Sequence, residues 1–306
     1  MTKMKKRVFE IRVPATTANL GPGFDSLGLA MRIYNRVTLT VGGDDGMEIE
    51  GYGADELPRD ESNLMVRAAR MLAEREGQAL PPMHWAAQHD IPLARGMGSS
   101  SAAIVAGLMA ADAALGLRGL RGPLTHLAAE IEGHPDNVAP ALVGGLTICM
   151  PGSEPMEVVR VRPLEGLRLA LLVPNYQLST ESMRRVLPRE VAFVDAVFNL
   201  SRSAAMVAAL EHGLWTTLKE ACRDRLHQPQ RMELMDGMKA IFEAAYEAGA
   251  HGVAVSGSGP TAVAFCTEGA DVIAQAMLKA AKSARVEAET RVTQPDLDGA
   301  TVTQKE

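Results

Sequence analysis

The stretch PLARGMGSSS at residues 92–101 places two glycines and three serines directly before a predicted helix. Apolar residues recur there at helical spacing, namely Ile104, Leu108, Ala111 and Leu115. Glycine lets a backbone approach a ligand closely, and the unpaired N–H groups at a helix start bind anions. The serine hydroxyls add donors or a magnesium ligand. The segment therefore suits the phosphates of a nucleoside triphosphate.

This loop differs from the two common phosphate-binding motifs. No Gly-Lys-Ser/Thr follows at the spacing that a Walker A loop requires. No alternating βαβ unit with a ribose-binding acid follows either, so the dinucleotide fingerprint is absent. Taken alone, the segment is also explained as an ordinary capped helix, and its interpretation depends on the rest of the chain.

Two other glycine-rich loops change that weight. Residues 18–25, ANLGPGFD, leave the first predicted strand, and residues 256–260, SGSGP, join two apolar strands. Each has a local explanation, because Asn, Gly, Pro and Asp form turns and glycine suits hairpin loops. Three such loops in one chain, each at a strand end or a helix start, are harder to explain as turns alone.

Strand and helix patterns mix in both halves of the chain, which predicts an α+β protein. The turn at 42–46 leads into 47–49, which we expect to form a hairpin with the strand before it. Ser62 can cap a helix that runs to Arg75 and stops at Gly77. The other expected strands lie at 9–13, 37–41, 144–150 and 167–173, with one more on each side of 256–260 and a last one that ends near 292. The other expected helices lie at 104–115 and 124–131, with two or three between 189 and 248 and one after 266.

Composition sets the class of protein. The chain has 306 residues, of which 47% are hydrophobic and 22% charged, with a net charge of −6. These values allow one or two globular domains and argue against a general nucleic-acid binder. We expect a cytoplasmic protein with no membrane partner, for three reasons. The three scattered cysteines do not suit a disulfide framework, charges interrupt every apolar run before it could span a bilayer, and charges also break the apolar stretch near the N-terminus. A composition shift at 151–166 predicts a domain boundary, and the polar residues from Gln294 are expected to fray.

Taken together, the loops resemble the three motifs of the GHMP kinase superfamily, and the resemblance spans residues 14–260. Further motifs are similar to the homoserine kinases within it: PATTANLGPGFDSLGLA at 14–30, EGHPDNVAPALVGG at 132–145, STESMRRVLP at 179–188 and DRLHQPQR at 224–231. The resemblance implies an S5-like N-terminal domain over 1–158 with the phosphate loop, and a ferredoxin-like C-terminal domain over 159–306. It also implies ATP-dependent phosphorylation of the L-homoserine hydroxyl, a step toward threonine, by an enzyme that can be a homodimer.

The resemblance assigns most of the site. Homoserine carries a carboxylate, an ammonium and a hydroxyl, and the family pattern places Arg184 and Arg231 at the carboxylate, with Arg185 the alternative to Arg184. Asp25 is the candidate for the ammonium. The other expected substrate-binding residues are Asn19, His134, Asn137 and Thr180. The expected ATP-binding residues are Asn63, Pro92, Leu93, Ala94, Arg95, Gly96, Met97, Gly98, Ser99, Ser100, Ser101, Gly257 and Gly259, although Asn63 also fits a helix cap.

Three residues, Asn137, Arg184 and Ser100, are expected to act in catalysis. Ser100 is the expected hydroxyl ligand of Mg²⁺, and Glu130, or Glu132, the expected carboxylate, with a slight preference for Glu130. We expect no dedicated protein base, because an amide such as Asn137 cannot take a proton. Two alternatives remain: another small-molecule GHMP kinase, which would have no use for two carboxylate-binding arginines, and a catalytically silent nucleotide-binding regulator, which would show a damaged phosphate loop.

Overall fold

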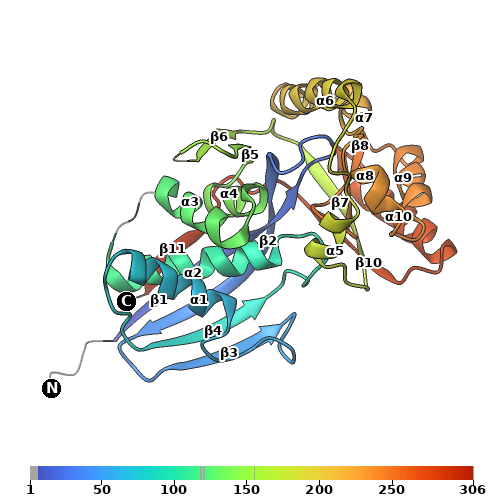
Figure 1. Cartoon of the computed structure of the whole chain (residues 1–306). Helices are drawn as coiled ribbons and strands as arrows, with labels where there is room; N and C mark the ends of the chain where they lie inside the picture. The colour runs from blue at the N-terminus through green and yellow to red at the C-terminus, as the bar shows by residue number, and fades with distance from the viewer. Residues whose placement is uncertain (1–5, 118, 120, 155, 306) are drawn as a thin grey trace, which may run out of the picture.

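The computed structural model describes residues 6–117, 119, 121–154 and 156–305, and it contains two sheets (Figure 1). The first sheet has seven strands: β11–β1–β2–β4–β3 in order, with β5 on β2 and β6 on β5. Its strands are β1 (Arg7–Ala18), β2 (Leu27–Val41), β3 (Gly46–Gly51), β4 (Met83–His89), β5 (Leu146–Met150), β6 (Glu157–Val161) and β11 (Thr301–Lys305). The alternation of Phe9, Ile11 and Val13, all buried, confirms the expected first strand.

One layer of helices, shown in Figure 1, covers the first sheet. The four are α1 (Leu64–Arg75), α2 (Ser99–Leu115), α3 (Arg121–Glu132) and α4 (Pro135–Val143). Helix α2 packs against α1, α3, α4 and β1, and most of its residues are buried. Helix α2 is therefore packed on several sides.

The second sheet is antiparallel, in the order β10–β7–β9–β8. Its strands are β7 (Arg168–Pro174), β8 (Gly252–Val255), β9 (Ala262–Cys266) and β10 (Ala288–Thr293). Strands β8 and β9 are entirely buried, as their continuous apolar runs predict. The other elements of this half are α5 (Thr180–Arg185), α6 (Phe193–His212), the 3₁₀ turn Trp215–Thr217, α7 (Leu218–Ala221), α8 (Gln228–Met232), α9 (Met238–Glu247) and α10 (Ala270–Ser283).

The α+β prediction is confirmed, but four local expectations are wrong. Strand β3 does not form a hairpin with β2; it pairs in parallel with β4, which lies between them. Helix α1 is capped by Asn63, whose side chain accepts the Met65 N–H at 3.0 Å, and not by Ser62. The region from 189 to 248 holds four α-helices where two or three were expected. Residues 301–305 form strand β11, which pairs with β1, so this described part of the C-terminal segment is not frayed.

The division of the chain at residues 158 and 159 stays a prediction. It falls inside β6, and both β6 and β11 belong to the first sheet. The last strand thus returns from the second half of the sequence to the first sheet, which ties the two halves together.

Helix α6 is the one helix of the described ranges that is long and apolar enough to cross a membrane by length and composition alone. Only 22% of that stretch is buried. It nevertheless carries Asp195, which pairs with Arg225 at 2.9 Å, and Arg202, which pairs with Glu220. A single helix that passes this test is weak evidence for a membrane span.

Candidate active site

A cavity of about 440 Å³ lies where the three glycine-rich loops meet. The expected site residues that line it are Asn19, Asp25, Asn63, Leu93, Ala94, Arg95, Gly96, Gly98, Ser99, Ser100, Ser101, Glu132, His134, Asn137, Thr180, Arg184, Arg231 and Gly257. The lining does not include Pro92, Met97, Glu130 or Gly259. Residues far apart in the sequence therefore come together around one hollow.

Hydrogen bonds join the three loops directly. The Ser256 hydroxyl donates to the carbonyl of Gly96 at 2.6 Å, and the Gly257 N–H donates to the carbonyl of Ala18 at 3.1 Å. The amide of Asn19 donates to the carbonyl of Gly257 at 2.9 Å. The third loop thus supports both the phosphate loop and the loop after β1.

Glycine is required at two positions of the phosphate loop. Gly96 and Gly98 both have φ of 72°, in the left-handed region that favours glycine. A Cβ at Gly96 would lie 2.1 Å from the carbonyl oxygen of Ser256, and one at Gly98 would lie 2.0 Å from the hydroxyl of Thr16. Gly98 is also the N-cap of α2, so the tight turn brings Ser99 and Ser100, at the start of the helix, into the cavity wall.

A carboxylate lies beside the serines of α2. The hydroxyls of Ser100 and Ser101 donate to Glu132 Oε1 at 2.6 and 2.9 Å. Glu130 instead pairs with Arg75 at 3.1 Å, outside the cavity lining. The geometry therefore favours Glu132 over Glu130 as the acid beside Ser100. No cluster of three or more His, Cys, Asp or Glu able to hold a metal occurs in the described part of the chain.

A polar chain continues from Glu132 along the start of α4. His134 Nδ1 lies 3.0 Å from Asp136 Oδ1, and Thr16 donates to Asn137 Oδ1 at 2.8 Å. Burial alone would lower the pKa of His134, but the hydrogen bond and charge of Asp136 and the charge of Glu132 outweigh it and raise the pKa. Asp136 also lines the cavity, although the motif in the sequence assigns it no role.

Arg184 and Asp25 form a two-pronged ion pair across the cavity. Arg184 Nη1 and Nη2 donate to the two carboxylate oxygens of Asp25 at 2.9 and 2.6 Å. This hydrogen bond raises the pKa of Arg184. Arg185 points to solvent, with its side chain 70% exposed and only a 3.9 Å contact to Glu181. Of the two neighbouring arginines, Arg184 alone lines the cavity.

Arg231 is the most deeply buried cation of the site, with 2% of its surface exposed. Its guanidinium donates to the carbonyls of Met183 and Gly257 at 3.3 and 3.1 Å. It forms no ion pair within the ranges that the structure describes. Burial, and then the charge of Arg184, lower the pKa of Arg231 to about 10, so the group keeps its charge at neutral pH. Such a cation favours an incoming carboxylate.

The other end of the cavity is more apolar and is formed by the first half of the chain. Leu57, Pro58, Met65, His89 and Leu93 line it. Burial lowers the pKa of His89, which disfavours the charged form of its ring. The amide of Asn63 is used locally, because it caps α1 and donates to the carbonyl of Pro58 at 2.7 Å. No motif in the sequence marks Leu57, Pro58 or His89.

The chain matches the family models for the N-terminal domain of GHMP kinases over residues 63–145 and for the C-terminal domain over 206–283. It is 43% identical to homoserine kinase of Moorella thermoacetica over 258 residues, covering 84% of this chain and 86% of the relative. It is 44% identical to homoserine kinase of Deinococcus radiodurans over 261 residues, covering 85% and 84%.

Solved structures with a similar fold include a homoserine kinase. The crystal structure of homoserine kinase from Cytophaga hutchinsonii superposes with a TM-score of 0.88 at 29% identity, covering 99% of both chains. Mevalonate diphosphate decarboxylase of Enterococcus faecalis shares the fold, with a TM-score of 0.69 at 13% identity. On the strength of these matches, the chain belongs to the homoserine kinase family of GHMP kinases.

Proposed function

We propose that this chain transfers the γ-phosphoryl group of ATP to the side-chain hydroxyl of L-homoserine and forms O-phospho-L-homoserine on the way to threonine. The relatives that bear the name homoserine kinase cover most of the chain. The observation that carries the proposal is one cavity that holds a glycine-rich helix start together with Arg231, Arg184 and Asp25.

An amino acid suits these charges better than a neutral alcohol does. Arg231 is a buried cation, and Arg184 and Asp25 already neutralise each other. A carboxylate supplies the missing anion for Arg231, while an ammonium can share Asp25. A neutral sugar would leave the buried guanidinium without a counter-charge, which is costly in a low dielectric.

The start of α2 provides the groups that a triphosphate needs. The first N–H groups of a helix have no partner within the helix, and its dipole favours anions there. Ser99 and Ser100 lie at this end, in the cavity wall. The apolar end of the cavity, near Leu57 and Met65, is the place we propose for the adenine ring.

Oxygen donors suited to magnesium are present at the same helix start. Ser100 Oγ and Glu132 Oε1 lie 2.6 Å apart, and hard cations prefer oxygen ligands, so these two residues would hold the ion with phosphate oxygens. Bound Mg²⁺ neutralises charge that develops on the phosphates. Glu132 therefore replaces Glu130 in our proposal.

We propose that no protein base takes the proton of the hydroxyl, which leaves to a phosphate oxygen or to solvent as the new O–P bond forms. The carboxylate of Asp136 is hydrogen-bonded to the ring of His134, and the side chain of Asn137 has no ionisable group. Phosphoryl transfer depends mostly on positioning and on charge neutralisation. We propose that Asn137, which accepts a hydrogen bond from Thr16, positions the hydroxyl. We also propose that Arg184 and Ser100 take part in neutralising the charge of the phosphoryl group during transfer. We also propose a cytoplasmic enzyme that can form a homodimer and has no nucleic-acid or membrane partner.

An assay of ADP release with Mg-ATP tests this function. The acceptors are L-homoserine, D-homoserine, mevalonate, galactose and shikimate. Turnover confined largely to L-homoserine is the expected result. Turnover of an alcohol that is not an amino acid would still support a kinase but would contradict the substrate-site assignments. ATP binding without turnover of any acceptor would favour a silent regulator.

A further inference from the structure

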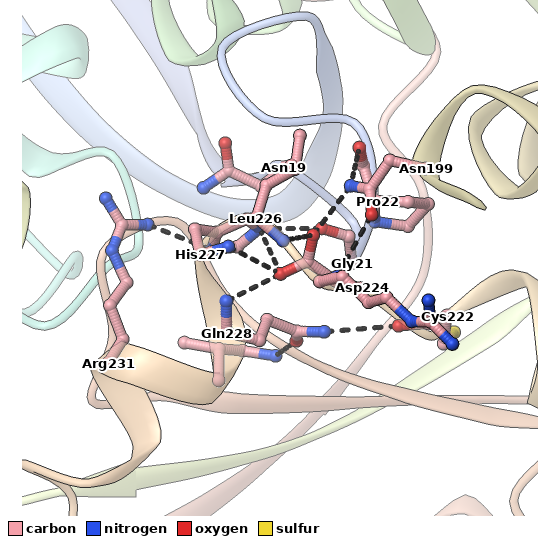
Figure 2. A network of polar contacts seen from close by, with 12 residues as sticks. Asn19, Gly21, Pro22, Asn199, Cys222, Asp224, Leu226, His227, Gln228 and Arg231 are labelled. Carbon is pink, nitrogen blue, oxygen red and sulfur yellow. Dashed lines mark hydrogen bonds and ion pairs between the residues drawn. The ribbon is translucent and has the colours of Figure 1, made fainter. Parts of the chain in front are cut away.

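A buried polar network lies beneath Arg231 and joins it to the loop after β1 (Figure 2). At its centre are the side chains of Asp224 and His227, both with 0% exposure. One carboxylate oxygen of Asp224 accepts from the amide of Asn199, and the other accepts from the backbone N–H groups of His227 and Gln228. Asp224 thus fixes the start of the short helix α8, which carries Arg231.

The ring of His227 has a different neighbour at each nitrogen. Nε2 lies 2.6 Å from the carbonyl oxygen of Gly21, and Nδ1 lies 3.3 Å from Nη1 of Arg231. A carbonyl only accepts and a guanidinium only donates, so Nε2 must carry the proton and Nδ1 must accept. Both bonds exist only in the neutral Nε2–H form of the ring. Figure 2 shows His227 between Gly21 and Arg231.

The same network holds the loop that carries the ammonium-binding candidates. The amide of Asn199 donates to the carbonyl of Pro22 at 3.0 Å as well as to Asp224 at 2.6 Å. The carbonyl of Gly257 accepts from both Asn19 and Arg231. Asn19 in turn accepts from the N–H of Asp25 at 3.0 Å. Asn19, expected at the ammonium, and Arg231, expected at the carboxylate, are therefore held by the same carbonyl group of Gly257.

We propose that His227 is a positioning residue: as a neutral acceptor at Nδ1, backed by Asp224, it orients the guanidinium of Arg231 toward the carboxylate of the amino-acid substrate. The inference rests on the proposed function, because it presumes a substrate with a carboxylate. His227 does not line the cavity, so we expect no direct contact between its ring and the substrate. Its effect on substrate binding passes through Arg231, whereas its bond to Gly21 contributes to stability.

The charges that face His227 support a neutral ring. They are Asp224 on its own segment, Arg231 on α8 and Asp25 on the loop after β1. Burial is the largest influence and lowers the pKa of His227, although the charge of Asp224 opposes it. A proton on Nδ1 would remove the acceptor and place a second positive charge beside the guanidinium of Arg231.

Two substitutions separate the two nitrogens. His227→Gln keeps a donor near the place of Nε2 and loses the acceptor for Arg231, whereas His227→Asn keeps an acceptor near the place of Nδ1 and loses the donor to Gly21. Steady-state kinetics with each substrate varied, together with thermal unfolding, are the measurements. The matched control is His212→Gln, because His212 lies on the surface with its side chain 66% exposed.

We expect His227→Gln to raise the KM for L-homoserine by about 10-fold or more, since a hydrogen bond to a charged group is lost. Its KM for ATP and its kcat should change by less than about threefold, a split that a general loss of structure does not produce. His227→Asn should unfold at a lower temperature but keep a KM for L-homoserine close to that of the wild type. Equal KM values for L-homoserine in both variants, or equal changes in the KM of both substrates, would overturn the proposal.

A measurement on the wild type decides the case if neither variant folds. Nitrogen NMR of the His227 ring, with the signal assigned through bonds to the backbone, should show a neutral Nε2–H form at pH 6. Addition of L-homoserine should shift the Nδ1 signal, and ATP alone should not. A charged ring, an Nδ1–H form or an Nδ1 signal unmoved by L-homoserine would contradict the proposal. If the wild type phosphorylates no amino acid, the proposed function fails first, which the ADP assay shows separately.

Discussion

The two walls of the cavity are built on different principles. The wall that we propose for the phosphates, called the phosphate wall, consists of backbone: Gly96 and Gly98 in left-handed conformations and the start of α2. The wall that we propose for the amino acid, called the amino-acid wall, consists of side chains, Arg184 and Arg231 from one half of the chain and Asp25 from the other. The backbone of the phosphate wall has no room for an added Cβ at Gly96 or Gly98. The side chains of the amino-acid wall instead determine which substrate binds. Damage to the first wall should remove activity altogether, and damage to the second should change affinity and specificity.

The sharpest break in this comparison is Gly98→Ala. We expect kcat/KM to fall by about 100-fold or more, because the added Cβ collides with Thr16 and moves the loop. Gly77→Ala is the matched control: its φ of 63° is similarly unfavourable, but nothing lies within 4 Å of its Cβ. Assays of both proteins check this, and equal activities would contradict the backbone account of the phosphate wall.

Arg231→Met tests the side-chain wall. The KM for L-homoserine should rise by about 100-fold, since a charge-assisted pair with the carboxylate is lost, while the KM for ATP stays within about threefold. Arg185→Met, on the solvent side of α5, should behave like the wild type. A rise in the KM for ATP as large as that for L-homoserine would mean that Arg231 supports the whole cavity and not the carboxylate alone.

Glu132→Gln and Glu130→Gln compare the two candidate acids. Glu132 contacts Ser100, so its replacement should raise the Mg²⁺ concentration for half-maximal activity by about tenfold. Glu130 pairs with Arg75, and its replacement should change that value by less than about twofold. Titration of activity with Mg²⁺ at fixed ATP gives both numbers, and the reverse order would restore Glu130.

Asp136→Asn sharpens the account of the proton. Without a dedicated base, turnover should fall by less than about tenfold. General base catalysis contributes about 10²–10⁴-fold. A loss in that range, measured as kcat at saturating substrates, would make Asp136 the base.

The smallest expected effect concerns the stability contributed by His134. Its pKa is raised in the folded state, so the stabilisation is complete below the ordinary value of about 6.5 and is lost as the pH rises through the raised value. Urea unfolding of the wild type and of His134→Gln should therefore differ most at low pH and converge at high pH. A difference that grows with pH would contradict the raised pKa.

The sequence predicted those parts of the molecule that depend on local patterns. The helix start at Gly98 and Ser99, the strand of Phe9, Ile11 and Val13, and the α+β class follow from residue spacing. The sequence drew attention to the three glycine-rich loops, and the bonds from Ser256 to Gly96 and from Asn19 to Gly257 show how they join.

The parts that sequence missed depend on pairings between distant residues. Strand β4 inserts between β2 and β3, which no turn signal in GGDDG reveals. The return of β11 to β1 depends on an edge about 290 residues away in the chain, by the pairing of Arg12 with Thr301. Glu130 and Glu132 differ by two positions on one helix, so only the packing of α3 shows which acid faces Ser100.

The central claim is that one wall of the cavity binds both the carboxylate and the ammonium of an amino acid. The direct test compares kcat/KM at saturating Mg-ATP for L-homoserine, for 4-hydroxybutanoate, which lacks the ammonium, and for 3-aminopropan-1-ol, which lacks the carboxylate. We predict that loss of either charge lowers kcat/KM by about 100-fold or more, because it leaves Arg231 without a carboxylate or removes the ammonium that we propose to share Asp25 with Arg184. Turnover of either analogue within about tenfold of L-homoserine would contradict the claim.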